Sequence, residues 1–198
     1  MGEAVARGRK SIGAKRNPES AEAIIEAAEA VLREAGYSGF SIEAVARRAR
    51  AGKPTIYRWW PSKAALLIEV YQRQKRVETP DTGNIEDDLA GFLKNLFDHW
   101  RDTPSGNVFR SLIAEAQSDA GAAAALADYS KGRRSHTGRI VERARTRGEV
   151  AADVDAEIVA DMIASYAWRQ LLTNRLDEDE AAIRKVVRYV VRGIAEAR

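Results

Sequence analysis

Four residues close together in the sequence carry side chains that suit a nucleic-acid backbone. Lys53, Thr55, Tyr57 and Arg58 bring an ammonium, two hydroxyls and a guanidinium, and all four groups donate hydrogen bonds to phosphate oxygens. Arg58 has a second possible partner, because a guanidinium pairs with O6 and N7 of guanine in the major groove. These residue types predict contact with DNA if the chain holds them on one exposed face.

Two short helices joined by a tight turn would hold them there. Ser41 is suited to cap the first helix, and Pro54 falls near the start of the second, where a missing N–H costs little. At about 100° per residue, Ile56 and Trp60 point inward while Pro54 and Arg58 point outward. This is a helix-turn-helix pattern, whose second helix enters the major groove. Spacing alone leaves open an ordinary solvated helix on a small helical domain. The apolar face of the first helix consists of Ile42, Val45, Ala46 and Ala49.

Basic residues are concentrated in the first third of the chain. Residues 1–63 hold 12 Lys and Arg against 7 Asp and Glu, whereas the remainder holds 20 against 22. Such a distribution indicates a nucleic-acid-binding head on a body with another task, although chance unevenness would also produce it. Lys63 stands at the start of a further helix, where its ammonium opposes the helix dipole unless a phosphate lies between them. A surface lysine with no partner is the alternative.

Composition excludes several functional classes. The chain has 198 residues, 45% hydrophobic and 31% charged, and no cysteine, which rules out a disulfide scaffold, a thiolate zinc site and a cysteine nucleophile. No apolar run approaches the roughly 18 residues of a membrane span, and no secretory signal precedes the fold. We therefore expect a cytoplasmic protein without a membrane partner. No phosphate loop, nucleophile elbow or HExxH motif suggests an enzyme, His99 and His136 are too few for a metal site, and no cofactor is expected.

The chain divides into four parts. Residues 1–16 form a flexible basic tail that either lies along DNA or has no defined site. Residues 17–74 form the DNA-binding domain, which begins with Asn17-Pro18-Glu19 as a helix start and has Gly36 as a left-handed cap. Residues 75–84 break the helical pattern and form the junction. Residues 85–198 form a regulatory and dimerisation domain.

The fold class expected is all-α, at roughly nine helices, because no strand-like alternation of useful length occurs. Helix 156–173 starts behind Asp155, and the last helix starts behind Asp177, with Glu180 completing a capping box. Gly132 and Gly138 mark possible bends in the longest helix. The helices expected in the body cover residues 85–101, 107–118, 120–147, 156–173 and 178–197.

The last two helices predict an interface between two copies of the chain. Helix 156–173 is apolar on two sides and helix 178–197 carries a wide apolar stripe, so a second copy would cover the surplus face in a C2 four-helix arrangement. A monomer whose helix 120–147 covers that face is the alternative. The residues predicted to face the partner are Ala160, Ala164, Ala167, Trp168, Leu171, Val187, Val190, Val191 and Ile194.

Apolar and aromatic residues of the body are numerous enough to surround a ligand cavity. Residues of this kind are more often core than ligand contacts, and that alternative stays open. The residues predicted to line such a cavity are Phe92, Leu96, Trp100, Phe109, Leu112, Tyr129, Met162 and Tyr166.

The stretch from Ser41 to Lys63 resembles the TetR/AcrR family of bacterial transcriptional regulators. The family pattern has a Thr or Ser cap, an Ile-Ala pair, a Gly-Val-Ser turn and Lys-Gly-Thr-Leu-Tyr followed by aromatic residues, a cap and Lys. This chain has Ser41, Val45-Ala46, Arg50-Ala51-Gly52, the run 53–60 and Ser62-Lys63. The resemblance covers residues 17–74 well. In the remainder it is carried more weakly by Arg147-Gly148-Glu149 and Asp153-Val154-Asp155.

Three positions depart from the family pattern. Arg50 and Pro54 stand where glycine is usual, and Trp59 replaces Tyr or His. If the backbone at Arg50 is left-handed, arginine there is disfavoured by about 1 kcal/mol. Pro54 lacks an N–H that would bind phosphate, and the Trp59 indole can only donate.

The resemblance implies a homodimer that places its two recognition helices in successive major grooves of a near-palindromic double-stranded operator. It further implies a repressor that a small lipophilic or aromatic effector releases from DNA. In family terms Ser41 anchors a phosphate, Arg58 and Pro54 can touch bases, and the others mostly hold phosphates. A helix-turn-helix protein controlled by a protein partner, or one that senses no ligand, is the alternative. The predicted DNA contacts are Ser41, Arg50, Lys53, Pro54, Thr55, Tyr57, Arg58, Trp59 and Lys63.

Overall fold

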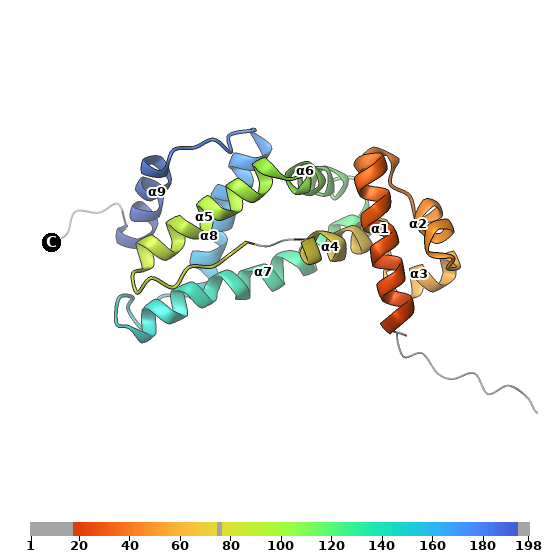
Figure 1. Ribbon diagram of the computed structural model, residues 1–198. Coiled ribbons are helices and arrows are strands. Elements are labelled where there is room, and N and C mark those ends of the chain that lie inside the picture. Colours follow the sequence, from red (N-terminus) through yellow and green to blue (C-terminus); the bar gives the residue numbers. More distant parts are fainter. Residues whose placement is uncertain (1–17, 75–76, 194–198) are drawn as a thin grey trace, which may run out of the picture.

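The computed structural model describes residues 18–74 and 77–193, and these residues form nine helices and no strand. The expected all-α fold is therefore confirmed. Figure 1 shows α1, α2 and α3 at one end of an elongated molecule, α5, α7, α8 and α9 in the other part, and α4 leading from one to the other. The tail at residues 1–16 and Ile194 lie outside the described residues. Within those ranges, no helix is both long and apolar enough to cross a membrane.

The head is built by α1 (Pro18–Gly39), α2 (Ile42–Ala49) and α3 (Lys53–Trp59), with α4 (Lys63–Gln74) packed against α1. Its core includes Ile24, Val45, Ile56 and Trp60, all of them buried. Gly36 has a φ of 65°, a conformation that glycine adopts without a steric penalty. The left-handed cap expected there is not formed: φ is positive, but ψ is −172°, and Gly36 makes a kink within α1 instead of ending it.

Local hydrogen bonds fix the turn between α2 and α3. The Ser41 hydroxyl accepts the backbone N–H of Ala44 at 3.2 Å and so caps α2. Arg50 ends that helix with φ 51° and ψ 37°, and its N–H is directed at the last carbonyls of α2. The left-handed backbone considered for Arg50 is thus present. Gly52 then caps α3, and Pro54 sits in its first turn, where its ring costs no helical hydrogen bond.

The body consists of α5 (Ile85–Asp102), α6 (Ser105–Glu115), α7 (Ala120–Thr146), α8 (Ala156–Leu172) and α9 (Glu180–Arg192). Here α7 packs on α8, and α5 packs on α9. The N-cap expected at Asp155 is confirmed, since its carboxylate accepts two backbone N–H groups.

Two expectations about the ends and continuity of these helices need correction. The last helix is capped by Asp179, which accepts the N–H of Ala182 at 2.7 Å, rather than by Asp177. Asp177 and Asp179 are each followed directly by a glutamate, and the two positions differ by about half a helical turn, so the sequence pattern fits either one as the cap. The helix α7 also continues through Gly132 and Gly138 as one element, because α8 packs along it; a Cβ at Gly138 would lie 3.4 Å from the carbonyl oxygen of Ala156.

The segment between head and body is fastened to the far end of α7. Asp88 is fully buried and accepts the Thr82 N–H at 2.6 Å and the Thr82 hydroxyl at 2.8 Å, and Arg147 donates to its second oxygen at 3.3 Å. Glu149 accepts the N–H of Ile85 at 2.7 Å. The Arg147-Gly148-Glu149 sequence therefore holds the start of α5 against the end of α7.

Candidate nucleic-acid interface and internal cavity

The helix α3 separates its two faces as the spacing predicted. Ile56 and Trp60 are 0% and 2% exposed, whereas 47% of Tyr57 is exposed. Pro54 and Arg58 are also exposed, and Thr55 and Trp59 are half-buried. The side chains with phosphate-binding chemistry therefore lie on the surface of the head, on the side opposite its core.

Aromatic side chains support this exposed face from below. The Arg58 guanidinium lies 5.4 Å from the centre of the Trp59 ring, and Trp59 meets Trp60 edge to face at 5.9 Å. Trp60 in turn donates its indole N–H to Glu69 on α4. The orientation of Arg58 is thus tied through two indoles to the core of the head.

Lys53 and its neighbours on α2 form a shallow basic hollow. The Lys53 ammonium pairs with Glu43 at 2.9 Å, and that hydrogen bond lowers the pKa of the Glu43 carboxyl. Both side chains are more than half exposed, so the pair contributes little and a phosphate can replace Glu43. Arg47 lines the same hollow beside Arg50. Sequence reasoning missed Arg47, although it lies one turn before Arg50 on the polar face of α2.

The Lys63 ammonium forms an ion pair with a residue of the body and is not free in solvent. It pairs with Glu115 of α6 at 2.9 Å and lies 4.8 Å from the centre of the Tyr37 ring. The Tyr37 hydroxyl donates to the same carboxylate, and partial burial together with this negative charge raises the pKa of Tyr37. Three helices, α1, α4 and α6, therefore meet at one carboxylate. The phosphate that the sequence suggested for Lys63 must compete with Glu115.

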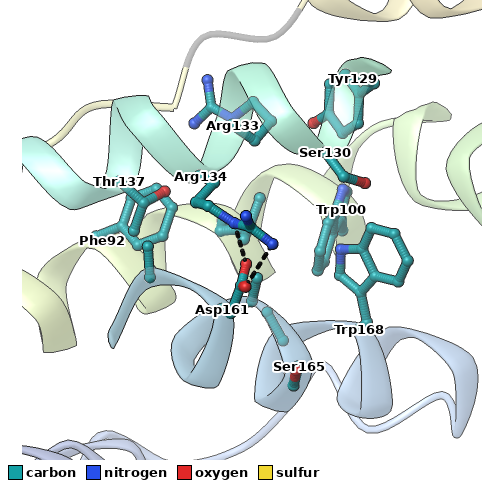
Figure 2. Close-up of a pocket in the computed structure, with 14 residues that line it drawn as sticks. Phe92, Trp100, Tyr129, Ser130, Arg133, Arg134, Thr137, Asp161, Ser165 and Trp168 are labelled. Carbon is teal, nitrogen blue, oxygen red and sulfur yellow. Dashed lines mark hydrogen bonds and ion pairs between the residues drawn. The ribbon is translucent and has the colours of Figure 1, made fainter. Parts of the chain in front are cut away.

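A cavity of about 290 Å³ lies in the body between α5, α7 and α8. Phe92 and Trp100 enter from α5, Tyr129 from α7 and Trp168 from α8, and the small residues Ala160, Ala164 and Ala167 form part of the α8 wall. Figure 2 shows the Trp100 and Trp168 rings side by side at one end and Phe92 at the other. Flat apolar walls of this kind suit an aromatic or lipophilic ligand.

An ion pair crosses the cavity between α7 and α8. Arg134 donates Nε to Asp161 Oδ1 at 2.9 Å and approaches Oδ2 with Nη2 at 2.6 Å, as the dashed lines in Figure 2 mark. About half of each side chain is exposed, 42% and 50% respectively. The pair is therefore solvent-accessible and separable at modest cost.

The structure divides the residues predicted to line a cavity into two groups. Phe92, Leu96, Trp100 and Tyr129 line it. Phe109 and Leu112 are buried behind the wall, where Phe109 stacks on Trp100 with 5.8 Å between ring centres. Met162 is 50% exposed on the outer side of α8, and Tyr166 turns toward Gln170, whose amide donates to its hydroxyl at 3.2 Å. The last four residues therefore do not line this cavity.

Polar residues of the cavity wall were missed because only apolar residues were considered. For Arg133 and Thr137, which follow Tyr129 at steps of four along one face of α7, this spacing was the available signal. The missed lining residues are Ser130, Arg133, Arg134, Thr137, Asp161 and Ser165.

A buried hydrogen-bonded pair connects the cavity to α4. The Trp100 indole donates to the Tyr71 hydroxyl at 2.8 Å, and that hydroxyl also hydrogen-bonds to Tyr129. Tyr71 is 1% exposed and stacks on Phe109 with ring centres 5.0 Å apart. Burial raises the pKa of its hydroxyl, so it remains a neutral hydrogen-bonding group. The helix that follows the recognition helix thus ends against two side chains of the cavity wall.

The residues predicted to face a second copy mostly lie inside the protomer, which corrects that assignment. Ala160, Ala167 and Leu171 are at most 1% exposed because α7 covers this side of α8, as the monomeric alternative held. Val187 is 0% exposed on α9, which packs on α5. Ala164 and Trp168 line the cavity, Val190 and Val191 are half-buried, and Ile194 is outside the described residues. The large apolar side chains that α8 and α9 do expose are Ile158, Met162, Leu172 and Tyr189.

Both parts of the chain match models of known protein families. The model for bacterial regulatory proteins of the tetR family matches residues 24–70, and the model for the tetracyclin repressor-like C-terminal domain matches residues 79–190. Within the part of the chain that the structure describes, no group of three or more His, Asp or Glu side chains is placed to hold a metal ion.

Individual proteins resemble the chain over most of its length. The uncharacterized HTH-type transcriptional regulator YdeS of Bacillus subtilis is 27% identical over 185 residues, which are 92% of this chain and 93% of YdeS. The DNA-binding transcriptional repressor TetR of Mycobacteroides abscessus is 30% identical over 162 residues, 78% of this chain and 80% of that protein. The crystal structure of TetR family transcription regulator SCO0332 superimposes with a TM-score of 0.76 at 30% identity, over 89% of this chain and 99% of that one.

Proposed function

Because this chain belongs to the TetR family of bacterial transcriptional regulators, and is therefore a DNA-binding regulator rather than an enzyme, we propose that it is a ligand-responsive repressor. It binds a palindromic operator as a homodimer, and a small molecule in the α5–α7–α8 cavity releases it. Repression, as opposed to activation, is supported by the relative from Mycobacteroides abscessus, which is described as a DNA-binding transcriptional repressor. A bacterial repressor meets its operator DNA in the cytoplasm, so we place the protein there.

The hydrogen bond between Trp100 and Tyr71 carries the ligand-responsive part of this proposal. Tyr71 belongs to α4, whose first residue, Lys63, follows α3 after a short turn. A ligand that displaces Trp100 or Tyr129 alters the hydrogen bonds that these side chains make to the Tyr71 hydroxyl. The resulting shift of α4 moves the recognition helix. Such coupling is reciprocal, since the ligand must prefer the DNA-incompetent state and DNA must weaken the ligand by the same factor.

On the DNA side, Arg58 and Pro54 face the bases while Lys53, Thr55, Tyr57 and Trp59 serve the phosphates. Ser41 already caps α2 through its hydroxyl, and the same oxygen can donate to a phosphate. Arg50 and Lys63 complete the set. The Lys63–Glu115 pair gives DNA a direct influence on the body, because a phosphate that attracts Lys63 weakens its hold on α6.

The outer stripe of α8 supports the homodimer. Ile158, Met162 and Leu172 are 59%, 50% and 48% exposed, and with Ser165 and Arg169 they recur every three or four residues along one face. That spacing is typical of a helix packed against another helix. Met162→Glu is expected to convert dimers to monomers in analytical ultracentrifugation, and a Met162→Glu protein that remains fully dimeric argues for another interface.

The test of the whole proposal begins with DNA selected by the protein from a random pool. The selected sites should be palindromic, and lipophilic compounds that raise the melting temperature should lower the affinity for those sites. Ala164→Trp fills the cavity and should abolish the compound's effect while leaving DNA binding intact. A compound that stabilises the protein through the cavity yet leaves operator affinity unchanged refutes ligand-induced release. That result favours control by a protein partner instead.

A further inference from the structure

Two adjacent arginines of α7 differ in how their guanidinium groups are satisfied. Arg134 has a bidentate partner in Asp161. Arg133 is half-buried, and its Nη2 is buried without a hydrogen-bond partner among the described residues. A buried charged donor without an acceptor is costly, so Arg133 is placed where the protein alone does not satisfy it.

Other arginines with a buried unpaired nitrogen are not in this position. Arg110, Arg143 and Arg145 each have an Nε atom without a hydrogen bond, but each donates from another nitrogen, to Asn174, Pro80 and Glu142 respectively. The Arg143 Nε is also ion-paired with Asp81 at 3.3 Å. Within the described ranges, Arg133 has neither a hydrogen bond nor an ion pair. It is therefore distinct from arginines that are merely imperfectly bonded.

The position of Arg133 joins two hollow regions of the body. It lines the aromatic cavity between α5, α7 and α8, and it also lines an open groove between α4 and α7. Tyr129 lines both as well, and the positive charge of Arg133 opposes the effect of burial on the pKa of the Tyr129 hydroxyl, which indicates that the two groups are close. Figure 2 shows the Arg133 guanidinium pointing away from the Arg134–Asp161 pair and from the space between Phe92 and Trp168, so a ligand must extend past Tyr129 to reach it.

The charges of the cavity wall favour an anionic ligand over a cationic one. The ionisable groups that line it are two guanidiniums and one carboxylate, apart from the Tyr129 hydroxyl, and the carboxylate of Asp161 is already engaged by Arg134. Glu157 adds a further acid near Arg134, at 3.7 Å. A cation would have to remove Asp161 from Arg134, whereas an anion can bind Arg133 without breaking any contact. Guanidinium and carboxylate form strong, often bidentate hydrogen bonds.

We propose that the effector is an organic acid. Its apolar part occupies the space among Phe92, Trp100 and Trp168, and its anionic group reaches past Tyr129 to Arg133. This inference rests on the proposed function for the meaning of the cavity, and adds the chemical class of the ligand and the residue that selects it.

The test measures the preference for acid over amide with the protein alone, without DNA. Two matched pairs of probes are naphthoate with naphthamide and decanoate with decanamide, titrated by calorimetry. At least one acid should bind wild type about tenfold or more tightly than its amide, as expected for a charge-assisted hydrogen bond. Arg133→Gln should reduce this ratio below about twofold, and Arg133→Lys should retain part of it, because it keeps the charge without the planar fork.

The double variant Arg134→Gln/Asp161→Asn is the matched control and should keep the ratio, since it removes the neighbouring ion pair without leaving the Asp161 carboxylate unpaired in the cavity. Thermal unfolding verifies that each variant is folded. The inference is overturned if neither acid is preferred over its amide by wild type, including the case in which neither acid binds, or if the preference survives Arg133→Gln in a folded protein. The proposed function fails separately. If an acid binds through Arg133 but leaves operator affinity unchanged, the acid site is supported and ligand-induced release is refuted. If an amide releases the protein from DNA as well as its acid does, ligand-induced release is supported and the preference for an acid is refuted.

Discussion

The head and the body of this regulator place their functional groups in opposite ways. In the head, the residues that we propose to face DNA, Lys53, Tyr57 and Arg58, lie on the surface of one short helix, and buried side chains hold that helix in place. In the body, the groups that matter converge on an interior space from three helices, with Phe92 and Trp168 at its two ends. The proposed DNA contacts therefore depend on exposed side chains, whereas the proposed ligand site depends on an interior cavity.

This difference predicts how each part responds to substitution. Surface groups of the head can be removed with little effect on folding, so that DNA affinity should change and stability should not. Buried groups of the body share hydrogen bonds and packing contacts, and their removal should affect stability first. The two parts are joined mainly through α4, which packs on α7 and α6. It contacts the cavity wall through Tyr71 and α6 through the Lys63–Glu115 pair.

The largest effect is expected at Asp88, the buried carboxylate between the junction and α7. Asp88→Ala should lower the free energy of unfolding by about 3–5 kcal/mol, because Arg147 loses a buried partner and Thr82 loses its acceptor. Denaturant unfolding measures it. Asp87→Ala is the matched control on the same helix, since it breaks only the exposed pair with Arg184 and should cost about 1 kcal/mol or less. Equal losses for the two variants contradict a structural role for the buried carboxylate.

The next effect belongs to the head and should leave stability untouched. Arg58→Ala should cost about 1–3 kcal/mol of operator binding and relax the preference at one base position, whereas Tyr57→Ala should weaken binding to all sequences alike. Competition binding at physiological salt, against the selected site and scrambled DNA, separates the two outcomes. If both variants bind like wild type, α3 does not read DNA through this face.

The same contrast explains which features the sequence allowed us to predict. The inward positions of Ile56 and Trp60 follow from a period of 3.6 within one short helix. The left-handed backbone at Arg50 was only a condition at the level of sequence, and the structure supplies it. The small residues of α8 were assigned to a partner because an apolar stripe does not identify the helix that covers it, and α7 covers this one. Nor does any local signal bring Glu115 to Lys63. Packing of distant helices decides both.

A smaller effect should appear where the two regions communicate. Tyr71→Phe removes the acceptor of the Trp100 indole while keeping the ring stack on Phe109, and should cost about 1 kcal/mol of stability. Operator affinity without ligand should change little, but a cavity ligand should release DNA less effectively. Titration of operator complexes with the ligand measures this coupling. A variant that is destabilised yet fully inducible shows that the signal passes by another route.

The smallest effect is expected at Arg50, where an arginine occupies a left-handed backbone position that favours glycine. Its left-handed backbone, with φ 51°, disfavours arginine by about 1 kcal/mol, so Arg50→Gly should raise stability by up to about that amount, or about 2–4 °C in melting temperature. The gain is reduced because glycine also adds freedom to the unfolded chain.

Arg50→Asn separates strain from charge, since Asn tolerates this conformation without carrying a positive charge. If Arg50 is retained for its charge at the DNA, both variants melt higher than wild type and both bind the operator more weakly, most clearly at low salt. Unchanged binding in both variants leaves the strained arginine without a role in DNA recognition.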